Sequence, residues 1–545
     1  MGKSEKGKKN FWLFLAILLF ALVLLILGFV GILYMYPNRP MLGLVYAKYT
    51  DAKAYTYDEN TDISTLDITS IEVHTERSNI NILPLDNGVY PLSTGSSGYT
   101  YEDNVIVVHQ VRRFEGFSLA NVGSPTYTAS LNSGNLKITT TEPYNFDINS
   151  ETYVNVYVPK DFSLTSIKAI STYGAVSLAT ITDASSFAVS SVNLQTLASS
   201  AINMGRINGI QNMYFRTNKG DVNFSDTHIS ANSITFQSTS GTFNLYNNAI
   251  TGIVEVADKL YLRADGASAG AKINIVKGNV EISGDSGNFL FSQIGTESTP
   301  ASLIATTDNS YIFVNALYGN ASIMEQTSSY SNVVHIKQLV SSNPSTIHVG
   351  SGSLLIENTS SDIYAESSSG PIEIKNVETD KNVYAYSQSG SIYVEYKTTN
   401  SMSEDTQTTI ITDSGNIDLK NISSCLSVEV REDSSYGTLN IMFNAIARKD
   451  GKTNTIKAGS RRVQFTWSGN SSDLKCKLFA TTSSITSTIP IMSLVESADA
   501  DYELGTYTDY YVQYRIGYNK GNTVSSASAG RLFITNASSI AVATN

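Results

Sequence analysis

The sequence predicts an all-β fold, a parallel β-helix or β-solenoid with rungs of about 18–25 residues, preceded by one N-terminal transmembrane helix. Three observations predict it. A short unit of two alternating runs around a polar corner recurs along the chain. Charged residues make up 16% of the chain, below the roughly 25% of average soluble domains, as suits a long sheet with many polar corners. A continuous apolar run stands near the N-terminus.

The repeated unit is clearest at residues 363–394, where two copies are centred on Gly370 and Gly390. Apolar residues stand seven and five positions before each glycine and two and four positions after it. Because alternation at period two places such residues on one face, the unit is typical of two strands joined by a turn. The core residues predicted in the clear copies are Ile71, Val73, Ile80, Ile82, Ile167, Ala169, Val176, Leu178, Met213, Phe215, Val222, Phe224, Ile234, Phe236, Phe243, Leu245, Val280, Ile282, Phe289, Phe291, Leu303, Ala305, Ile312, Val314, Ile363, Ala365, Ile372, Ile374, Val383, Ala385, Ile392 and Val394.

Most corners combine a central glycine, replaced by Ser78 and Ser310 in two copies, with a short polar residue two positions earlier. We expect the glycine to supply positive φ at the turn. We expect the polar residue to bond the corner backbone and, because rungs stack, to form a ladder along one edge. The residues in this position are Asn218, Thr239, Asp285, Asp308, Ser368, Gln388 and Asp413.

The N-terminal segment predicts a single membrane crossing. Residues 1–10 contain four lysines and form the expected cytoplasmic tail, because positive charge favours retention in the cytoplasm. Residues 11–36 are continuously apolar and, at about 1.5 Å per residue, long enough to cross a bilayer of about 30 Å. A cleaved signal peptide is the alternative, but its apolar region is normally about 7–15 residues long. An uncleaved signal-anchor is therefore expected.

The rest of the chain divides by the regularity of its rungs. Residues 37–62, with two prolines and a polar stretch rich in tyrosine, are expected to form a stalk. Residues 63–165 are expected to form an irregular β N-terminal part of the solenoid, and residues 166–445 its regular part. Residues 446–545 are expected to form a β-rich C-terminal cap or a small domain, since the last rung of a solenoid needs cover.

The run YVNVYVPK at 153–160, followed by SLTSIKAISTYGAVSL at 163–178, resembles the entry to the solenoid of the bacterial putative-adhesin family. That family is similar in its membrane segment, its irregular first sheet and its rungs with a Ser-Gly corner. The resemblance covers residues 65–445. It implies a membrane-anchored β-solenoid and carries no catalytic motif.

The outward positions of the clearest copies carry tyrosines, which offer flat amphipathic surface to a glycan or a protein partner. The alternative is that these tyrosines only stabilise the sheet through cross-strand pairing, worth about 0.2–1 kcal/mol per pair. The residues of this expected ligand face are Tyr364, Tyr384, Tyr386, Tyr393 and Tyr396.

The two cysteines, Cys425 and Cys476, could form one disulfide if the body lies outside the cytosol, and two free buried thiols are the alternative. The five histidines are scattered and make no metal site by spacing, so we expect neither a metal nor a cofactor. The net charge of −11 argues against nucleic acid as a partner.

These observations favour a single-pass cell-membrane protein with a cytoplasmic N-terminus and an extracytoplasmic body. It would act as an adhesin-like or structural cell-envelope binding protein and not as an enzyme. One alternative is a carbohydrate-active surface enzyme, resembling a polysaccharide lyase or hydrolase, that uses Asp285, Asp308 and Asp413; corner hydrogen bonding is the simpler role for these residues. A second alternative is an accessory protein of the envelope stress response.

Overall fold

The computed structural model covers the chain as two compact units, Met1–Ile210 and Gln211–Asn545. The residues that the structure describes are 3–35, 44–57, 67–85, 89–90, 99–100, 106–119, 126–141, 146–159, 162–180, 188–207, 209–246, 252–326, 333–398, 405–422, 424–433, 437–443, 454–468, 476–480, 484–487, 491–494, 512–516 and 530–544.

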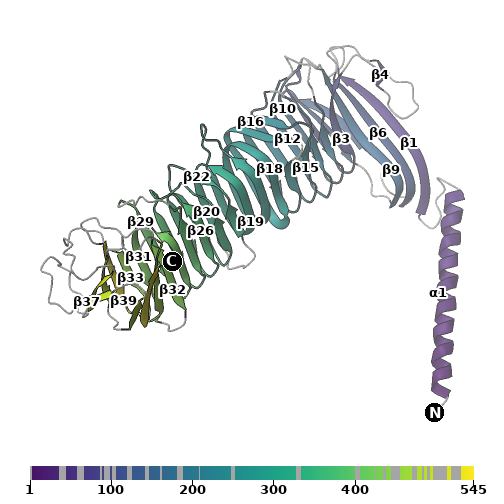
Figure 1. Cartoon of the computed structure of the whole chain (residues 1–545). Helices are drawn as coiled ribbons and strands as arrows, with labels where there is room; N and C mark the ends of the chain where they lie inside the picture. Colours follow the sequence, from purple (N-terminus) through teal and green to yellow (C-terminus); the bar gives the residue numbers. More distant parts are fainter. Residues whose placement is uncertain are drawn as a thin grey trace. The chain divides into compact units, whose positions relative to one another are not determined.

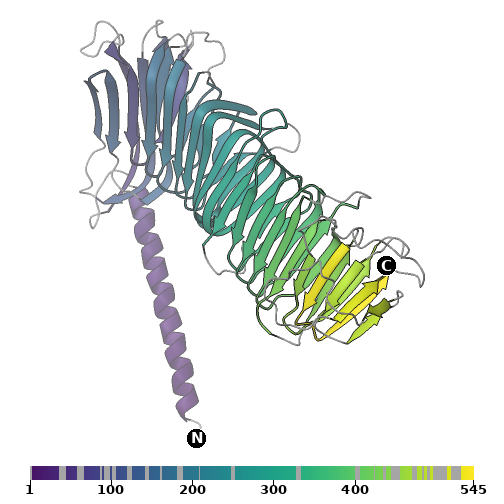
Figure 2. The ribbon, with the colours of Figure 1, turned by 90° about the vertical axis from the view of Figure 1, so that its left-hand side faces the viewer.

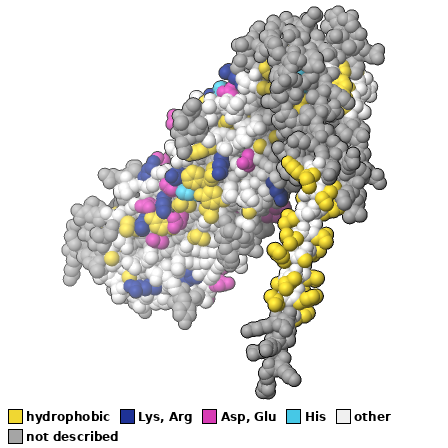
Figure 3. All heavy atoms as spheres, turned by 90° about the vertical axis from the view of Figure 1, so that its right-hand side faces the viewer, with side chains coloured by type: hydrophobic (Ala, Val, Ile, Leu, Met, Phe, Trp, Pro, Cys, Tyr) yellow, Lys and Arg dark blue, Asp and Glu magenta, His cyan; other side chains and the backbone are white. Residues whose placement is uncertain are grey.

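The first unit begins with helix α1 (Lys3–Met35), whose segment Phe11–Met35 is long and apolar enough to cross a membrane. Its side chains from Phe11 onward are exposed on nearly all sides, with Leu33 as a buried exception. Figure 3 shows hydrophobic side chains along the visible face of this helix. A helix that is apolar all round and uncovered by protein is suited to a lipid environment.

The strands of the first unit are β1 (Leu44–Tyr57), β2 (Ser70–Thr75), β3 (Asn79–Leu85), β4 (Val89–Tyr90), β5 (Tyr99–Thr100), β6 (Ile106–Leu119), β7 (Thr126–Asn132), β8 (Asn135–Thr141), β9 (Phe146–Pro159), β10 (Ser163–Ser171), β11 (Val176–Leu178), β12 (Ala188–Thr196) and β13 (Ile202–Met204). Strands β8, β2, β10 and β12 pair in parallel in that order. Strands β9, β3, β11 and β13 form the matching parallel sheet. Each rung contributes one strand to each sheet.

Within residues 37–62, the expected stalk, the described residues 44–57 form strand β1. Strand β1 pairs with β6 in antiparallel register along its whole length, from Leu44 opposite Leu119 to Tyr57 opposite Ile106. Strand β6 in turn pairs with β9. The reason lies in the composition of the segment, because tyrosine, threonine and valine favour strands. Tyr55 stacks on Tyr127 with ring centroids 3.9 Å apart, and the Tyr57 and Tyr127 hydroxyls lie 2.8 Å apart.

In the irregular part, residues 63–165, the chain leaves the regular order of rungs and later returns to it; we call such a segment an excursion. After the first rung, β2 and β3, the chain leaves to form β6 to β9 and returns at β10. Strands β8 and β9 then cover one side of the first rung, while β10 and β11 cover the other. The excursion therefore covers the edge that the first rung would otherwise expose.

The strands of the second unit are β14 (Asn212–Thr217), β15 (Val222–Phe224), β16 (His228–Ser238), β17 (Thr242–Leu245), β18 (Ile253–Ile294), β19 (Leu303–Tyr318), β20 (Ala321–Glu325), β21 (Val333–Ile336), β22 (Leu339–Val340), β23 (Ser345–Val349), β24 (Ser353–Ile356), β25 (Ile363–Ser367), β26 (Ile372–Val377), β27 (Val383–Ser387), β28 (Ile392–Tyr396), β29 (Gln407–Thr412), β30 (Ile417–Ile422), β31 (Cys425–Val430), β32 (Thr438–Phe443), β33 (Asn454–Lys457), β34 (Arg462–Trp467), β35 (Cys476–Ala480), β36 (Ile485–Ser487), β37 (Ile491–Leu494), β38 (Val512–Ile516), β39 (Gly530–Thr535) and β40 (Ser539–Thr544).

Two parallel sheets run through this unit, and Figures 1 and 2 show their strands stacked side by side. We call first sheet the one that contains β20, β23, β25, β27, β29 and β31, in that order. The second sheet contains β21, β24, β26, β28, β30 and β32. Strands β18 and β19 bend through corners and belong to both.

The solenoid pattern continues past residue 445, within the predicted C-terminal cap. Strands β33 and β34 extend the first and second sheets in parallel. The last strands of the chain, β39 and β40, then pair with β33 and β34 on one side and with β35 and β36 on the other. Strands β35, β38 and β37 pair in antiparallel fashion beyond them. A second excursion thus forms this end of the stack.

The predicted core is confirmed at nearly every position. All of the core residues named from the clear copies are buried except Phe224, which is half-buried and packs against the rings of Phe215 and Phe243. The equivalent residues stack in register, as with Ile363 beside Val383 and Ala365 beside Ala385.

The corner glycines are required for a different reason from the one predicted. Gly370, Gly390 and Gly415 are not among the described residues with positive φ. A Cβ on Gly390 would instead lie 2.0 Å from the carbonyl oxygen of Gly370, and one on Gly370 would lie 1.7 Å from that of Gly352. The rungs therefore stack so closely at this corner that only glycine fits.

The hydroxyl that bonds the corner stands three positions before the glycine, not two. Ser387 Oγ accepts a hydrogen bond from Gly390 N at 2.9 Å, and Thr412 Oγ1 accepts one from Gly415 N at 2.7 Å. Both side chains are buried, because position minus three points inward. The residue at minus two points outward, which frees it for other contacts.

We predict that Gly390→Ala lowers the free energy of unfolding by about 1–3 kcal/mol, because the added methyl group overpacks the corner against a neighbouring carbonyl. Denaturant unfolding of the full chain in detergent measures it. The control is Ser389→Ala at the exposed neighbouring position, which should change stability by less than about 0.5 kcal/mol. Equal stability of Gly390→Ala and the natural protein would contradict the close stacking.

A second prediction concerns pH. His109 in β6 is fully buried, its ring 5.0 Å from that of Tyr157, and burial lowers its pKa to about 4 because the charged form loses solvation. The unfolded chain, with a pKa near 6.5, then binds more protons than the folded chain between these values. Stability should fall by at most about 1.4 kcal/mol per unit as pH drops from about 6.5 to about 4.

This dependence is isolated by comparing the natural protein with His109→Gln in thermal unfolding at a series of pH values. The difference in unfolding temperature between the natural protein and His109→Gln should narrow as pH falls from about 6.5 to about 4, and it should stay constant above pH 6.5. A difference that does not change with pH would show that His109 is not buried in its neutral form.

Candidate functional site

The structure divides the five predicted tyrosines among three places. Tyr364 on β25 and Tyr384 and Tyr386 on β27 point outward from the first sheet. Tyr393 points outward from the second sheet, on β28, and Tyr396 is buried. The predicted single ligand face therefore reduces to the three tyrosines of the first sheet.

Tyr364 and Tyr384 form a stacked pair. Parallel pairing of β25 with β27 places them directly side by side. Their ring centroids lie 4.3 Å apart and their planes differ by 2°. Because adjacent strands are about 4.8 Å apart, in-register rungs bring identical rings to stacking distance without further adjustment. Tyr364 remains 40% exposed.

One side of this pair is bordered by Glu366 and His348. The Tyr364 hydroxyl donates to Glu366 Oε1 at 2.7 Å, and His348 Nδ1 lies 3.3 Å from Glu366 Oε2. The hydrogen bond to Glu366, followed by burial, raises the pKa of Tyr364 above its ordinary value of 10.0, so the phenol stays neutral at physiological pH. The pair is thus held in one orientation by a carboxylate.

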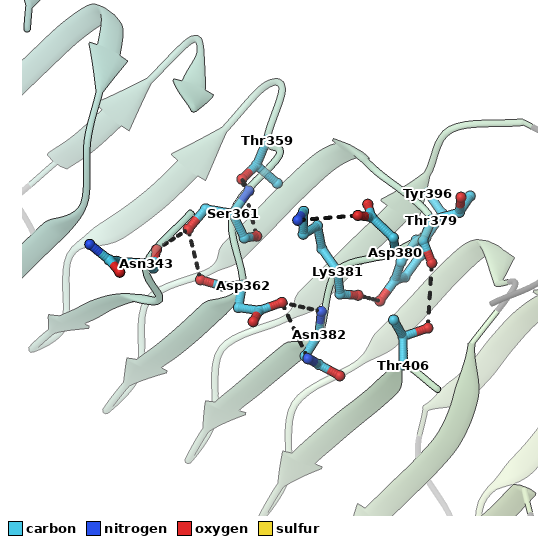
Figure 4. Close-up of polar contacts among 10 residues, drawn as sticks. All are labelled: Asn343, Thr359, Ser361, Asp362, Thr379, Asp380, Lys381, Asn382, Tyr396 and Thr406. Carbon is cyan, nitrogen blue, oxygen red and sulfur yellow. Dashed lines mark hydrogen bonds and ion pairs between the residues drawn. The ribbon is translucent and has the colours of Figure 1, made fainter. Parts of the chain in front are cut away.

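The other side is bordered by Asp362 and Asn382, one rung apart. Asp362 Oδ1 accepts hydrogen bonds from the backbone N and the Nδ2 of Asn382, at 2.7 and 3.2 Å. Figure 4 shows this bridge beside the hydrogen bonds of Ser361 at the same corner. Asn382 Oδ1 accepts from the backbone N of Gln407, which extends the ladder to β29.

The ring face of Tyr364 that points away from Tyr384 is directed toward β23. The residue in register there is Thr346, which is short and exposed. A ring lying on Thr346 would continue the stack of Tyr384 and Tyr364 by one more step. We call this place the Thr346 shelf, bounded by Thr346, Tyr364, His348, Glu366 and Asp362.

Large apolar side chains lie on the same face beyond the shelf. Met324 on β20 is 54% exposed and in register with His348. Ile304 on β19 is 44% exposed and two strands from Thr346 in the same row. Exposed apolar groups of this size next to stacked rings are typical of a contact surface.

Tyr386 closes the opposite end of the face. Its hydroxyl donates to Asp413 Oδ2 at 3.3 Å, and the guanidinium carbon of Arg431 lies 5.2 Å from its ring centroid. Arg431 also approaches Asp413 at 3.9 Å. This tyrosine is therefore engaged with the side chains that directly follow β29 and β31, and it offers less free ring surface than Tyr364.

Tyr393 on the second sheet is similarly occupied. Lys375 and Lys420, from the strands on either side, place their ammonium groups 5.8 and 5.0 Å from its ring centroid. Its hydroxyl donates to Glu395 at 2.6 Å. Because cations stand over the ring from both neighbouring strands, Tyr393 is a structural residue of its sheet.

Tyr396 was wrongly assigned to the exposed face. It is 0% exposed, and its hydroxyl lies 2.6 Å from Thr408 Oγ1 and donates to the carbonyl oxygen of Lys381 at 3.2 Å. Burial raises its pKa to about 12. The physical reason is period two, because Tyr396 follows the inward Val394 by two positions.

The predicted disulfide is not supported by the strand order. Cys425 begins β31 and Cys476 begins β35, and strands β33 and β39 lie between them. Three strand spacings amount to about 14 Å, whereas bonded cysteines have Cα atoms within about 7 Å. Cys425 is buried, and the side chain of Cys476 lies outside the described residues.

The three aspartates of the enzyme alternative do not meet. Asp285 and Asp308 are neighbours on β18 and β19, as predicted for equivalent corner residues. Asp413 follows β29, five strands further along the first sheet, or about 24 Å. Among the described residues, no three His, Cys, Asp or Glu side chains gather as metal ligands would.

Thr346, His348, Asp362 and Asn382 were missed as site residues, although the sequence contains the signal for two of them. A less regular copy of the repeated unit is centred on Gly352. Thr346 and His348 stand six and four positions before this glycine, as Tyr364 and Glu366 stand before Gly370 in the next copy. Asp362 and Asn382 stand at the strand starts, where alternation alone predicts no hydrogen bond.

Residues 68–299 match the Toastrack DUF4097 family model, which confirms the family resemblance predicted from the rungs. A structure from Bacteroides fragilis described as a putative adhesin is similar, with 9% identity, a TM-score of 0.27, and coverage of 52% of this chain and 95% of that one. A putative cell adhesion protein from Clostridium sporogenes has 9% identity, a TM-score of 0.19, and coverage of 58% and 100%. Scores this low support no conclusion about function. No curated protein matches the chain.

We predict that Tyr396→Phe destabilises the protein by about 1 kcal/mol, because a buried hydroxyl loses its hydrogen bonds and leaves Thr408 and the Lys381 carbonyl with one partner fewer. Thermal unfolding of the full chain measures the change. Tyr364→Phe is the matched control, and it should cost less because its hydroxyl bond is exposed. A larger loss of stability in Tyr364→Phe than in Tyr396→Phe would contradict the buried position of Tyr396.

Proposed function

We propose that this chain is a membrane-anchored, adhesin-like surface protein that binds its partner through the outward face of the first sheet. The segment Phe11–Met35 of helix α1 is the anchor, with the lysine-rich residues 1–10 on the cytoplasmic side and the β-strands of both units outside. The body acts by presenting a contact surface and not by catalysis.

The single observation that carries the proposal is the Tyr364–Tyr384 pair with its open ring face. Stacked tyrosines present flat area at low conformational cost, and the Tyr364 hydroxyl is already oriented by the Glu366 carboxylate. Met324 and Ile304 extend the exposed apolar area on the same face. A sheet that needed these tyrosines only for cross-strand pairing would gain nothing from the exposed Met324.

The N-terminal apolar helix supports the surface location that we propose. The segment Phe11–Met35 is long and apolar enough to cross a membrane, and lysines precede it. Positive charge beside a membrane helix favours the cytoplasmic side. The 510 residues that follow would then lie outside the cytoplasm.

We expect cells that display the chain to attach to a surface to which cells lacking it do not, and we expect external protease to abolish this attachment. Protease added to intact cells should remove the body while the N-terminal tail, carrying an epitope tag, survives. Immunoblotting and counts of attached cells measure the two effects. The control is a cytoplasmic marker, which must remain intact.

A body that resists protease on intact cells and is cleaved only after lysis would overturn the proposed topology. A body that is removed without any loss of attachment would overturn the adhesive role.

A further inference from the structure

We infer that the Thr346 shelf binds a sugar ring that carries a free amino group, as in a glucosamine polymer. This inference rests on the proposed function and names the ligand class for that surface. The ring would lie on the open face of Tyr364, above Thr346, with its ammonium group toward Asp362 and Glu366.

The geometry selects a ring as the occupant. Tyr384 and Tyr364 are parallel within 2° at a spacing of 4.3 Å, and the next position of this row holds only Thr346. The space one step along the row is therefore shaped for a flat group of ring size. The axial C–H groups of a pyranose carry partial positive charge and are attracted to the electron-rich face of an aromatic ring.

The polar groups around the shelf select a sugar over a purely apolar ring. Asp362 and Glu366 stand two residues before and after Tyr364, so they border the ring on its two sides. Asp362 Oδ2 accepts no hydrogen bond from the described residues, and His348 lies one strand away at the level of Glu366. Hydroxyl and ammonium groups at the ring edge thus meet hydrogen-bond acceptors on both sides.

Charge selects a cationic sugar. Strands β20, β23, β25, β27 and β29 contain no lysine and no arginine, whereas the shelf carries two carboxylates. The whole chain has a net charge of −11, so its field also repels anions. An acidic polysaccharide is therefore excluded from this place, and an amino sugar is complementary to it.

Tyr393 provides the contrast on the second sheet. Its ring lies between the ammonium groups of Lys375 and Lys420, and Glu373 and Asp418 stand in register with it on the two neighbouring strands. The same residue type therefore serves as a binding platform in one sheet and as a structural residue in the other.

The test is isothermal titration of the full chain in detergent with the glucosamine hexamer. The matched probes are the N-acetylglucosamine hexamer, the glucose hexamer, the galacturonate hexamer and hexalysine. We expect the glucosamine hexamer to bind at least about tenfold more tightly than each of the others. Equal binding of hexalysine would show that charge alone is recognised. Equal binding of the N-acetylated hexamer would show that the free amino group is not recognised. Either result overturns the inference.

The decisive variant is Thr346→Tyr, which removes no group of the site but fills the shelf with a third ring. Thr409→Tyr is its matched control, because Thr409 is in register with Tyr384 at the other end of the pair. We expect Thr346→Tyr to weaken binding at least about tenfold and Thr409→Tyr to leave it unchanged, both variants remaining folded by circular dichroism. Equal effects of the two variants, or none, would overturn the location.

The two proposals fail separately. If cells attach through the body and Tyr364→Ala abolishes attachment while the glucosamine hexamer does not bind, only the ligand class is wrong. If the body confers no attachment at all, the proposed function fails, whatever the chain binds in solution.

Discussion

In-register parallel stacking of the rungs is the constraint on which the rest of the structure depends. Each residue of a strand lies beside its equivalent in the next rung, as Ala365 lies beside Ala385 and Tyr364 beside Tyr384. The same constraint makes the corner so tight that Gly370 and Gly390 can carry no Cβ. Core, corner and outward face are thus three consequences of one repeated backbone geometry.

The repeat let the sequence predict the core, the parallel solenoid and the outward direction of Tyr364 and Tyr384, because period two and fixed offsets determine both. It led to the expectation of a C-terminal cap, but it did not predict the pairing of the two excursions, in which β6 pairs with β1 and β9 in the first unit and β38 pairs with β35 and β37 in the second. These segments pair with distant partners, and local alternation contains no information about partners. Tyr396 was a different case, since period two alone places it inside with Val394.

The two sheets of the second unit use outward aromatic residues in different ways. On the second sheet, Lys375 and Lys420 of the neighbouring strands and Glu395 of the same strand contact Tyr393, which stabilises the sheet. On the first sheet, the row ends at Thr346, and one ring face of Tyr364 is left without a stacking partner among the described residues. A binding surface arises here because one rung of a regular series lacks the ring that the next two rungs carry.

The central claim, that this interrupted row is the functional face, is tested most directly by a crystal structure of the chain with the glucosamine hexamer. The account predicts a sugar ring stacked on Tyr364 above Thr346, with its amino group toward Asp362 or Glu366. A hexamer bound on the second sheet beside Tyr393, or at the corners with no contact to Tyr364, would contradict it.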